Sequence, residues 1–310
     1  MTPAVLAALA PVVLLIALGV GLRRRRFLPE AFWAGAERLG YTVLLPALFV
    51  HGLATARLEA LPVWALGGTV AGATAATAGL ALLLRPWLGA DGPAFTSIFQ
   101  GAIRFNNYVG VTVAAGLYGA EGVALAAVCN AAIVPTANLL CVLVFARHGT
   151  ARLDARGIAR QLGTNPLILS CGLGIALQAG RVPLPPGVDG ALRALGAASL
   201  PLGLLCVGAA LEFGGARRWF GPVLAASVLK FGALPGAAAG LGLAFGLSGP
   251  AFAVALLFAA MPTASSAFIL ARQLGGDAPL MAGITAAQTL LAAAAIPAAL
   301  ALGAWLAGMP

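Results

Sequence analysis

Three polar side chains interrupt the fourth apolar stretch of the chain, where a membrane helix would lie deepest in the bilayer. They are Arg104, Asn106 and Asn107, within the run 93–117. A charged or amide group at this depth costs on the order of a few kcal/mol unless it is paired or hydrated. Because ionisable groups kept inside a membrane mark solute and ion pathways, these residues are candidates for a binding site.

The ninth apolar stretch, 250–272, has a second interruption at a corresponding place. Pro262 removes a backbone donor there, and three hydroxyl residues follow it: Thr263, Ser265 and Ser266. A helix that begins inside the bilayer carries unpaired N–H groups and a partial positive charge, which suits a carboxylate. The simpler interpretation is a packing kink, but two breaks at matched positions favour a binding site.

Lys230, the single lysine of the chain, lies within the eighth apolar stretch. It is interpreted as a counter-charge that replaces a metal cation or as a group that titrates during transport; the alternative is a lysine bonded to a carbonyl at a helix kink. No Asp or Glu is expected at mid-membrane, so the site should prefer anions. Secondary candidates are Asn130, Asn138 and Gln288, for which interhelical hydrogen bonding is the simpler role.

The composition places these residues in a membrane protein. The chain has 310 residues, of which 61% are hydrophobic and only 9% charged. A soluble domain of this size would need a more charged surface. The net charge of +9 resides mostly in short loops, where it sets topology and does not indicate nucleic acid binding. The four cysteines lack the spacing of metal ligands, so we expect no metal or other cofactor. No intramembrane nucleophile is paired with a base, so we expect that the protein is not an enzyme.

The elements that position the site are ten apolar segments of about 20 residues each. They are 3–22, 36–55, 61–84, 93–117, 122–146, 165–180, 195–213, 219–246, 250–272 and 279–307. Thirteen loop arginines fall on one side of the membrane and three on the other. The arginine-rich side is expected in the cytoplasm and both termini outside, as in a multi-pass protein of a bacterial inner membrane.

The two halves of the chain repeat each other. Pro11–Leu22 aligns with Pro166–Leu177 at a shift of 155 residues, and the tetrapeptide GPAF recurs at 92 and 249, a shift of 157. A nearly constant shift predicts an internal repeat, 1–146 and 165–310, joined by a cytoplasmic linker at 147–164. Because each half holds five spans, the halves must enter the bilayer from opposite sides. The fold class predicted is an all-α polytopic membrane protein, a 5+5 inverted repeat with two broken, crossing helices.

The run Arg104–Gly110, closing with Leu117-Tyr118-Gly119, resembles the fourth-span signature of the auxin efflux carrier family. That family includes bacterial malate and malonate permeases and is related to the plant PIN-FORMED auxin exporters. Asn165–Ile168, Pro201-Leu202 with Gly208, Lys230 and Met261-Pro262 resemble further elements of it in the same order.

The resemblance implies a fold similar to sodium/proton antiporters and bile acid symporters. It implies a scaffold domain (spans 1, 2, 6 and 7), a transport domain (spans 3–5 and 8–10) and elevator-type transport of a small organic anion such as a dicarboxylate. The expected partners are that anion, the lipid bilayer and a second copy of the chain through the scaffold domain. A sodium-coupled bile acid or pantoate-type symporter of the same fold and a substrate-sensing receptor without transport are the alternatives.

Overall fold

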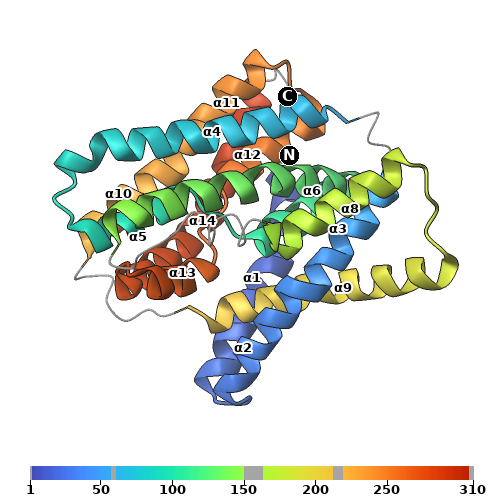
Figure 1. The fold of residues 1–310 in the computed structure, drawn as a ribbon, viewed down its shortest axis with the longest axis horizontal. Coiled ribbons are helices and arrows are strands. Elements are labelled where there is room, and N and C mark those ends of the chain that lie inside the picture. The colour runs from blue at the N-terminus through green and yellow to red at the C-terminus, as the bar shows by residue number, and fades with distance from the viewer. Residues whose placement is uncertain (1, 57–60, 150–162, 212–218, 307–310) are drawn as a thin grey trace. The chain divides into compact units, whose positions relative to one another are not determined.

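A computed structural model describes residues 2–56, 61–149, 163–211 and 219–306, and every regular element in these ranges is a helix. Figure 1 shows their order along the chain. Within the cytoplasmic linker predicted at 147–164, residues 150–162 lie outside the described ranges. By their contacts the helices form two compact units, 1–64 with 107–131 and 163–210 (the first unit), and 65–106 with 132–162 and 211–310 (the second unit).

The helices have the length and hydropathy of membrane spans. Among the described residues, six stretches are long and apolar enough to cross a bilayer: Pro3–Arg24, Val63–Trp87, Gly92–His148, Pro186–Ala209, Phe220–Ala244 and Ala278–Leu306. Pro166–Ala179 and Gly249–Ala259 are shorter apolar helices. Large apolar side chains face outward on these helices, as on α1, where Leu14 is 69% exposed. The chain is therefore an all-α, multi-pass membrane protein.

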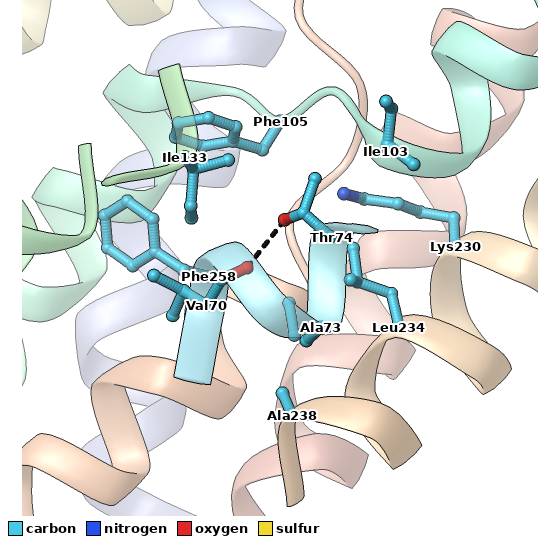
Figure 2. Close-up of a pocket in the computed structure, with 11 residues that line it drawn as sticks. Val70, Ala73, Thr74, Ile103, Phe105, Ile133, Lys230, Leu234, Ala238 and Phe258 are labelled. Atoms are coloured by element: carbon cyan, nitrogen blue, oxygen red, sulfur yellow. Dashed lines mark hydrogen bonds between the residues drawn. The ribbon is translucent and has the colours of Figure 1, made fainter. Parts of the chain in front are cut away.

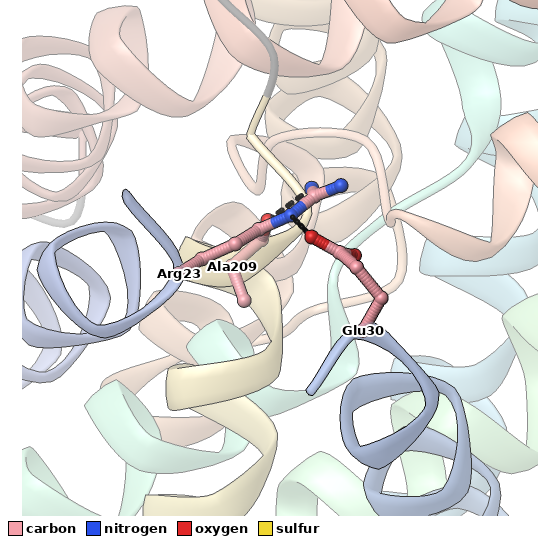
Figure 3. A network of polar contacts seen from close by, with 3 residues as sticks. All are labelled: Arg23, Glu30 and Ala209. Carbon is pink, nitrogen blue, oxygen red and sulfur yellow. Dashed lines mark hydrogen bonds and ion pairs between the residues drawn. The ribbon is translucent and has the colours of Figure 1, made fainter. Parts of the chain in front are cut away.

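The first unit contains α1 (Thr2–Arg24), α2 (Glu30–Leu39), the π-helical turn η1 (Gly40–Leu44), α3 (Leu45–Ala54), part of α6 (Asn107–His148), α8 (Pro166–Ala179) and α9 (Pro186–Ala209). Helix α9 packs against α1, α2 and α3, and α3 also packs against α8. The end of α1 is tied down by Arg23, which donates to the carbonyl of Ala209 and forms an ion pair with Glu30 at 3.2 Å (Figure 3).

Small residues allow this close packing. A Cβ on Gly203 of α9 would lie 2.1 Å from the ring of Tyr108, so only glycine leaves room for that ring. A Cβ on Gly208 would lie 2.0 Å from the carbonyl oxygen of Ile16 in α1. Close approach of backbones through small residues is how membrane helices associate, since lipid supplies no hydrophobic driving force between them.

The predicted boundaries of the seventh span were wrong. The span was expected at 195–213, but the helix runs from Pro186 to Ala209. The added turns contain Asp189 and Arg193, whose charge removes them from a hydropathy window. Asp189 is held by His51 of α3, with Nε2 and Oδ1 3.0 Å apart, so this polar end is tied into the first unit.

The second unit contains α4 (Val63–Leu84), the 3₁₀ turn η3 (Arg85–Trp87), α5 (Gly92–Ile103), the end of α6 (Asn107–His148), α10 (Phe220–Val228), the π-helical turn η4 (Leu229–Ala233), α11 (Leu234–Ala244), α12 (Gly249–Ala259), α13 (Ser266–Leu274) and α14 (Ala278–Leu306). Helix α5 contacts α10, α13 and α14, and α14 also contacts α12. The breaks in the helical backbone lie within this group of helices and are described next.

Candidate functional site

The first interruption is present at the position that the sequence predicted. Helix α5 begins at Gly92, where the Asp91 carboxylate accepts a hydrogen bond from the Ala94 N–H at 2.8 Å, and it ends at Ile103. Arg104 is extended, with φ −76° and ψ 156°, and α6 begins at Asn107. These angles lie outside the α region of φ/ψ space, so the helix ends before Arg104.

The second interruption is also present. Helix α12 ends at Ala259 and α13 begins at Ser266, with six non-helical residues between them. Pro262 lies in this gap, where it offers no N–H and disfavours helical backbone at the preceding residue. The broken segments begin 157 residues apart, at Gly92 and Gly249, and end at glycines with positive φ, Gly119 and Gly275.

The end of α5 and the second break are joined by buried hydrogen bonds. Thr263 donates from Oγ1 to the Gly101 carbonyl at 3.1 Å. Gln288 of α14 donates to the same carbonyl at 2.9 Å and accepts from the Thr263 N–H at 3.1 Å. One amide side chain thus satisfies a donor from one break and an acceptor beside the other, as buried polar groups require.

Gly101 makes this approach possible. A Cβ at this position would lie 2.7 Å from a methyl group of Ile284 and 3.0 Å from the Cβ of Ala226. Any larger residue would push α5 away from α10 and α14. The position of both breaks therefore depends on the absence of one side chain.

Arg104 supplies a positive charge beside the start of α13. Its guanidinium donates to Asn138 Oδ1 at 2.9 Å and to Ser266 Oγ at 3.3 Å, and its Nε is buried without a hydrogen-bond partner. No described carboxylate pairs with it. The guanidinium and the amino-terminal end of α13 are both electropositive, and together they favour an anion.

Lys230 is a second positively charged residue near the breaks of this unit. It lies in η4, and its side chain is 0% exposed. Its Nζ has no hydrogen-bond partner among the described residues. Figure 2 shows it beside a cavity whose wall includes Thr74 and Phe258, with a volume of about 10 Å³, roughly the room one water needs.

The π-helical turn around Lys230 has a local cause. Pro235 is the second residue after η4, in the first turn of α11. A proline in a continuous helix loses one hydrogen bond and clashes with a carbonyl of the preceding turn. A π-helical turn widens the helix at that point and accommodates the proline, which is a common arrangement at functional sites.

The remaining predicted residues divide between the units. Asn106, Pro262 and Ser265 belong to the second unit with Arg104, whereas Asn107 and Asn130 belong to the first. Asn130 donates to the carbonyl of Ala126 on its own helix at 2.8 Å, unlike Gln288, which bridges two elements. The carboxamide oxygens of both first-unit asparagines are buried without a partner.

Sequence reasoning missed Gln100. Its side chain is 0% exposed, its Nε2 is 3.4 Å from the Ala267 carbonyl of α13, and its Oε1 has no partner. A signal was available, because Gln100 is the one amide within the apolar helix α5 and precedes the break by a single turn.

Comparison with known proteins agrees with a membrane-spanning chain. Residues 150–300 match the family model of a membrane transport protein, the transport domain of the auxin efflux carriers. This part of the chain is therefore similar to that transport domain. A search of curated proteins found no match.

The family match includes Lys230, the second break and Gln288. It confirms the resemblance drawn from the sequence and, with the apolar helices, makes the protein a membrane transporter. Membership in a transporter family agrees with the expectation that the protein is not an enzyme.

Proposed function

We propose that this auxin efflux carrier family member is a secondary transporter of a small organic anion with a carboxylate group, in the cytoplasmic membrane of a bacterium. The observation that carries the proposal is the charge of the second unit around its breaks. Arg104 and Lys230 are both partly or fully buried, and neither has a carboxylate partner among the described residues. A carboxylate on the solute would supply the missing negative charge.

The carboxylates of the second unit support this sign. Those that the structure describes are Asp91 and Asp277, and both cap helices: Asp91 accepts from the Ala94 N–H at 2.8 Å and Asp277 from the Leu280 N–H at 2.9 Å. Neither forms an ion pair with Arg104 or Lys230. A sodium site would instead need clustered oxygen ligands, and Arg104 and Lys230 would oppose a cation there.

The proposed site comprises Arg104, Asn106 and Asn138 near the first break, and Pro262, Thr263, Ser265, Ser266 and Gln288 at the second. Arg104 would bind the carboxylate directly, with its unpartnered Nε and with the Nη2 that now donates to Ser266 Oγ. Gln288 and Thr263 would hold the two breaks in register. Lys230 would act as the counter-charge within the unit.

The proposed mechanism is alternating access of the elevator type, in a fold of ten crossings with inverted repeats. The matched broken segments at Gly92 and Gly249 support an internal repeat, and the inverted arrangement is one that allows alternating access. The second unit, which holds the site, would be the moving domain.

The test is ligand binding by the purified protein. Carboxylates should raise the unfolding temperature, whereas their neutral amides should not. Arg104→Gln should weaken carboxylate binding at least about 10-fold, because hydrogen bonds to charged groups contribute about 1.5–3 kcal/mol. Arg193→Gln changes an exposed arginine of α9 and is the matched control. Equal carboxylate binding by both variants, or stabilisation by sodium alone, would contradict the proposal.

A further inference from the structure

A cluster of basic side chains lies at the end of the second unit where α4 and α6 end and α5 begins. It consists of Arg85 in η3 and of Arg147 and His148 at the end of α6, and is called the Arg85 cluster below. The buried ring of Phe95 holds it together. The Arg85 guanidinium carbon is 5.4 Å from the centroid of that ring, and His148 meets the ring edge-on at 5.5 Å.

The backbone fixes the same arrangement. A Cβ on Gly92, the first residue of α5, would lie 2.5 Å from the carbonyl oxygen of His148. The end of α6 is therefore in contact with the start of α5. Arg147 precedes His148 in the last turn of α6, so its charge lies at the same end of the unit.

No ion pair among the described residues joins this cluster to a carboxylate. Asp91 and Asp277 lie at this end of the unit, where the Asp277 N–H donates to the Pro93 carbonyl at 3.1 Å. Their carboxylates are used as helix caps, at 2.8 Å and 2.9 Å from backbone N–H groups. No described ion pair joins either of them to the Arg85 cluster.

The surroundings of the cluster are apolar and exposed. Leu83 is 71% exposed and Trp87 is 78% exposed, on either side of Arg85 in the sequence. They lie at the end of the candidate span Val63–Trp87, and the end of a membrane span is expected at the level of the lipid headgroups. Trp is enriched at that level because its ring is apolar and its N–H is polar.

We propose that the Arg85 cluster binds the phosphate group of an anionic phospholipid. The two guanidinium groups would contact the phosphate oxygens, since their planar, multiple donors match that geometry. Stacking on Phe95 fixes the Arg85 guanidinium in advance and lowers the entropy lost on binding. Trp87 and Leu83 would contact the glycerol and acyl chains. This site is independent of the proposed transport site.

The test is lipid titration of the purified, delipidated protein in neutral detergent, followed by its unfolding temperature and by native mass spectrometry. Phosphatidylglycerol should bind and stabilise the wild-type protein more strongly than phosphatidylcholine does. The double variant Arg85→Gln/Arg147→Gln should bind phosphatidylglycerol about 25-fold more weakly, because each basic residue near an anionic surface contributes roughly a factor of five. The matched control is Arg38→Gln/Arg193→Gln, which removes two exposed arginines of the first unit.

Two further measurements keep the outcomes distinct. The unfolding temperature without lipid should be alike in the double variant and the control, which shows that the fold is intact. Arg85→Lys keeps the charge but loses the planar fork, so its affinity should be intermediate. Equal affinity for both lipids, an equal loss in the control, or full stabilisation by inorganic phosphate alone would overturn the proposal.

Discussion

Replacing Lys230 with Met should make the protein more stable to heat and at the same time impair transport. The Lys230 side chain is 0% exposed and its Nζ has no partner among the described residues. An unsatisfied buried polar group costs about 1–3 kcal/mol. Met is of similar length and is apolar, so Lys230→Met should raise the free energy of unfolding by about that amount.

Two measurements check this prediction. The unfolding temperature in detergent should rise by roughly 2 °C or more, since 1 kcal/mol shifts it by about 2–4 °C in domains of 150–250 residues. In proteoliposomes, the transport rate should fall, and the charge moved per anion should change by one elementary charge, because Met carries no proton. Leu234→Met alters the wall of the same cavity without changing any charge, and it should leave both quantities unchanged.

Two results would contradict this role of Lys230. A lower unfolding temperature for Lys230→Met would mean that the lysine has a stabilising partner. An unchanged transport rate, with unchanged charge movement, would return Lys230 to a structural role.

Three further predictions concern packing and the buried amide. Gly101→Ala should destabilise the second unit by about 1–3 kcal/mol through overpacking, whereas Gly79→Ala, in open space on α4, should not; unfolding temperatures compare them. Gly203→Ala should lower the stability at least as much, because its Cβ would lie 2.1 Å from an aromatic ring. Gly187→Ala on the same helix is the control, and equal unfolding temperatures of the two variants would contradict the close packing at Gly203. Gln288→Leu leaves the buried Thr263 N–H unpaired and removes one of the two hydrogen bonds to the Gly101 carbonyl, so it should cost about 1–3 kcal/mol and abolish carboxylate binding; wild-type binding by a folded Gln288→Leu protein would exclude its role.

The helix breaks were predictable because their causes are local. Pro262 removes a helical hydrogen bond and is followed directly by polar residues, and the polar run after Ile103 lowers hydropathy over a few residues. The apolar lengths of α4 and α14 likewise follow from hydropathy, and both helices begin and end within two residues of the predicted spans. The first turns of α9 were not predicted because they contain charged residues, and hydropathy does not detect the part of a helix that continues beyond the apolar stretch.

The hydrogen-bond network of the candidate site was less predictable because its partners are distant in sequence. Gln288 and Gly101 are 187 positions apart, and Arg104 and Ser266 are 162 apart. The residue types mark candidates, but only the fold determines which of them meet. Asn107 and Asn130 show this limit, since they carry the same amide group as Asn138 and belong to the other unit.

The most direct test of the central claim is carboxylate binding by the wild-type protein and by Arg104→Gln, measured by calorimetry in detergent across a panel of carboxylates, their neutral amides and amines. Some carboxylates should bind, whereas their amides and the amines should not. Arg104→Gln should lower carboxylate affinity at least about 10-fold. Tight binding of amines or amides, or carboxylate binding that is unchanged in Arg104→Gln, would contradict the claim.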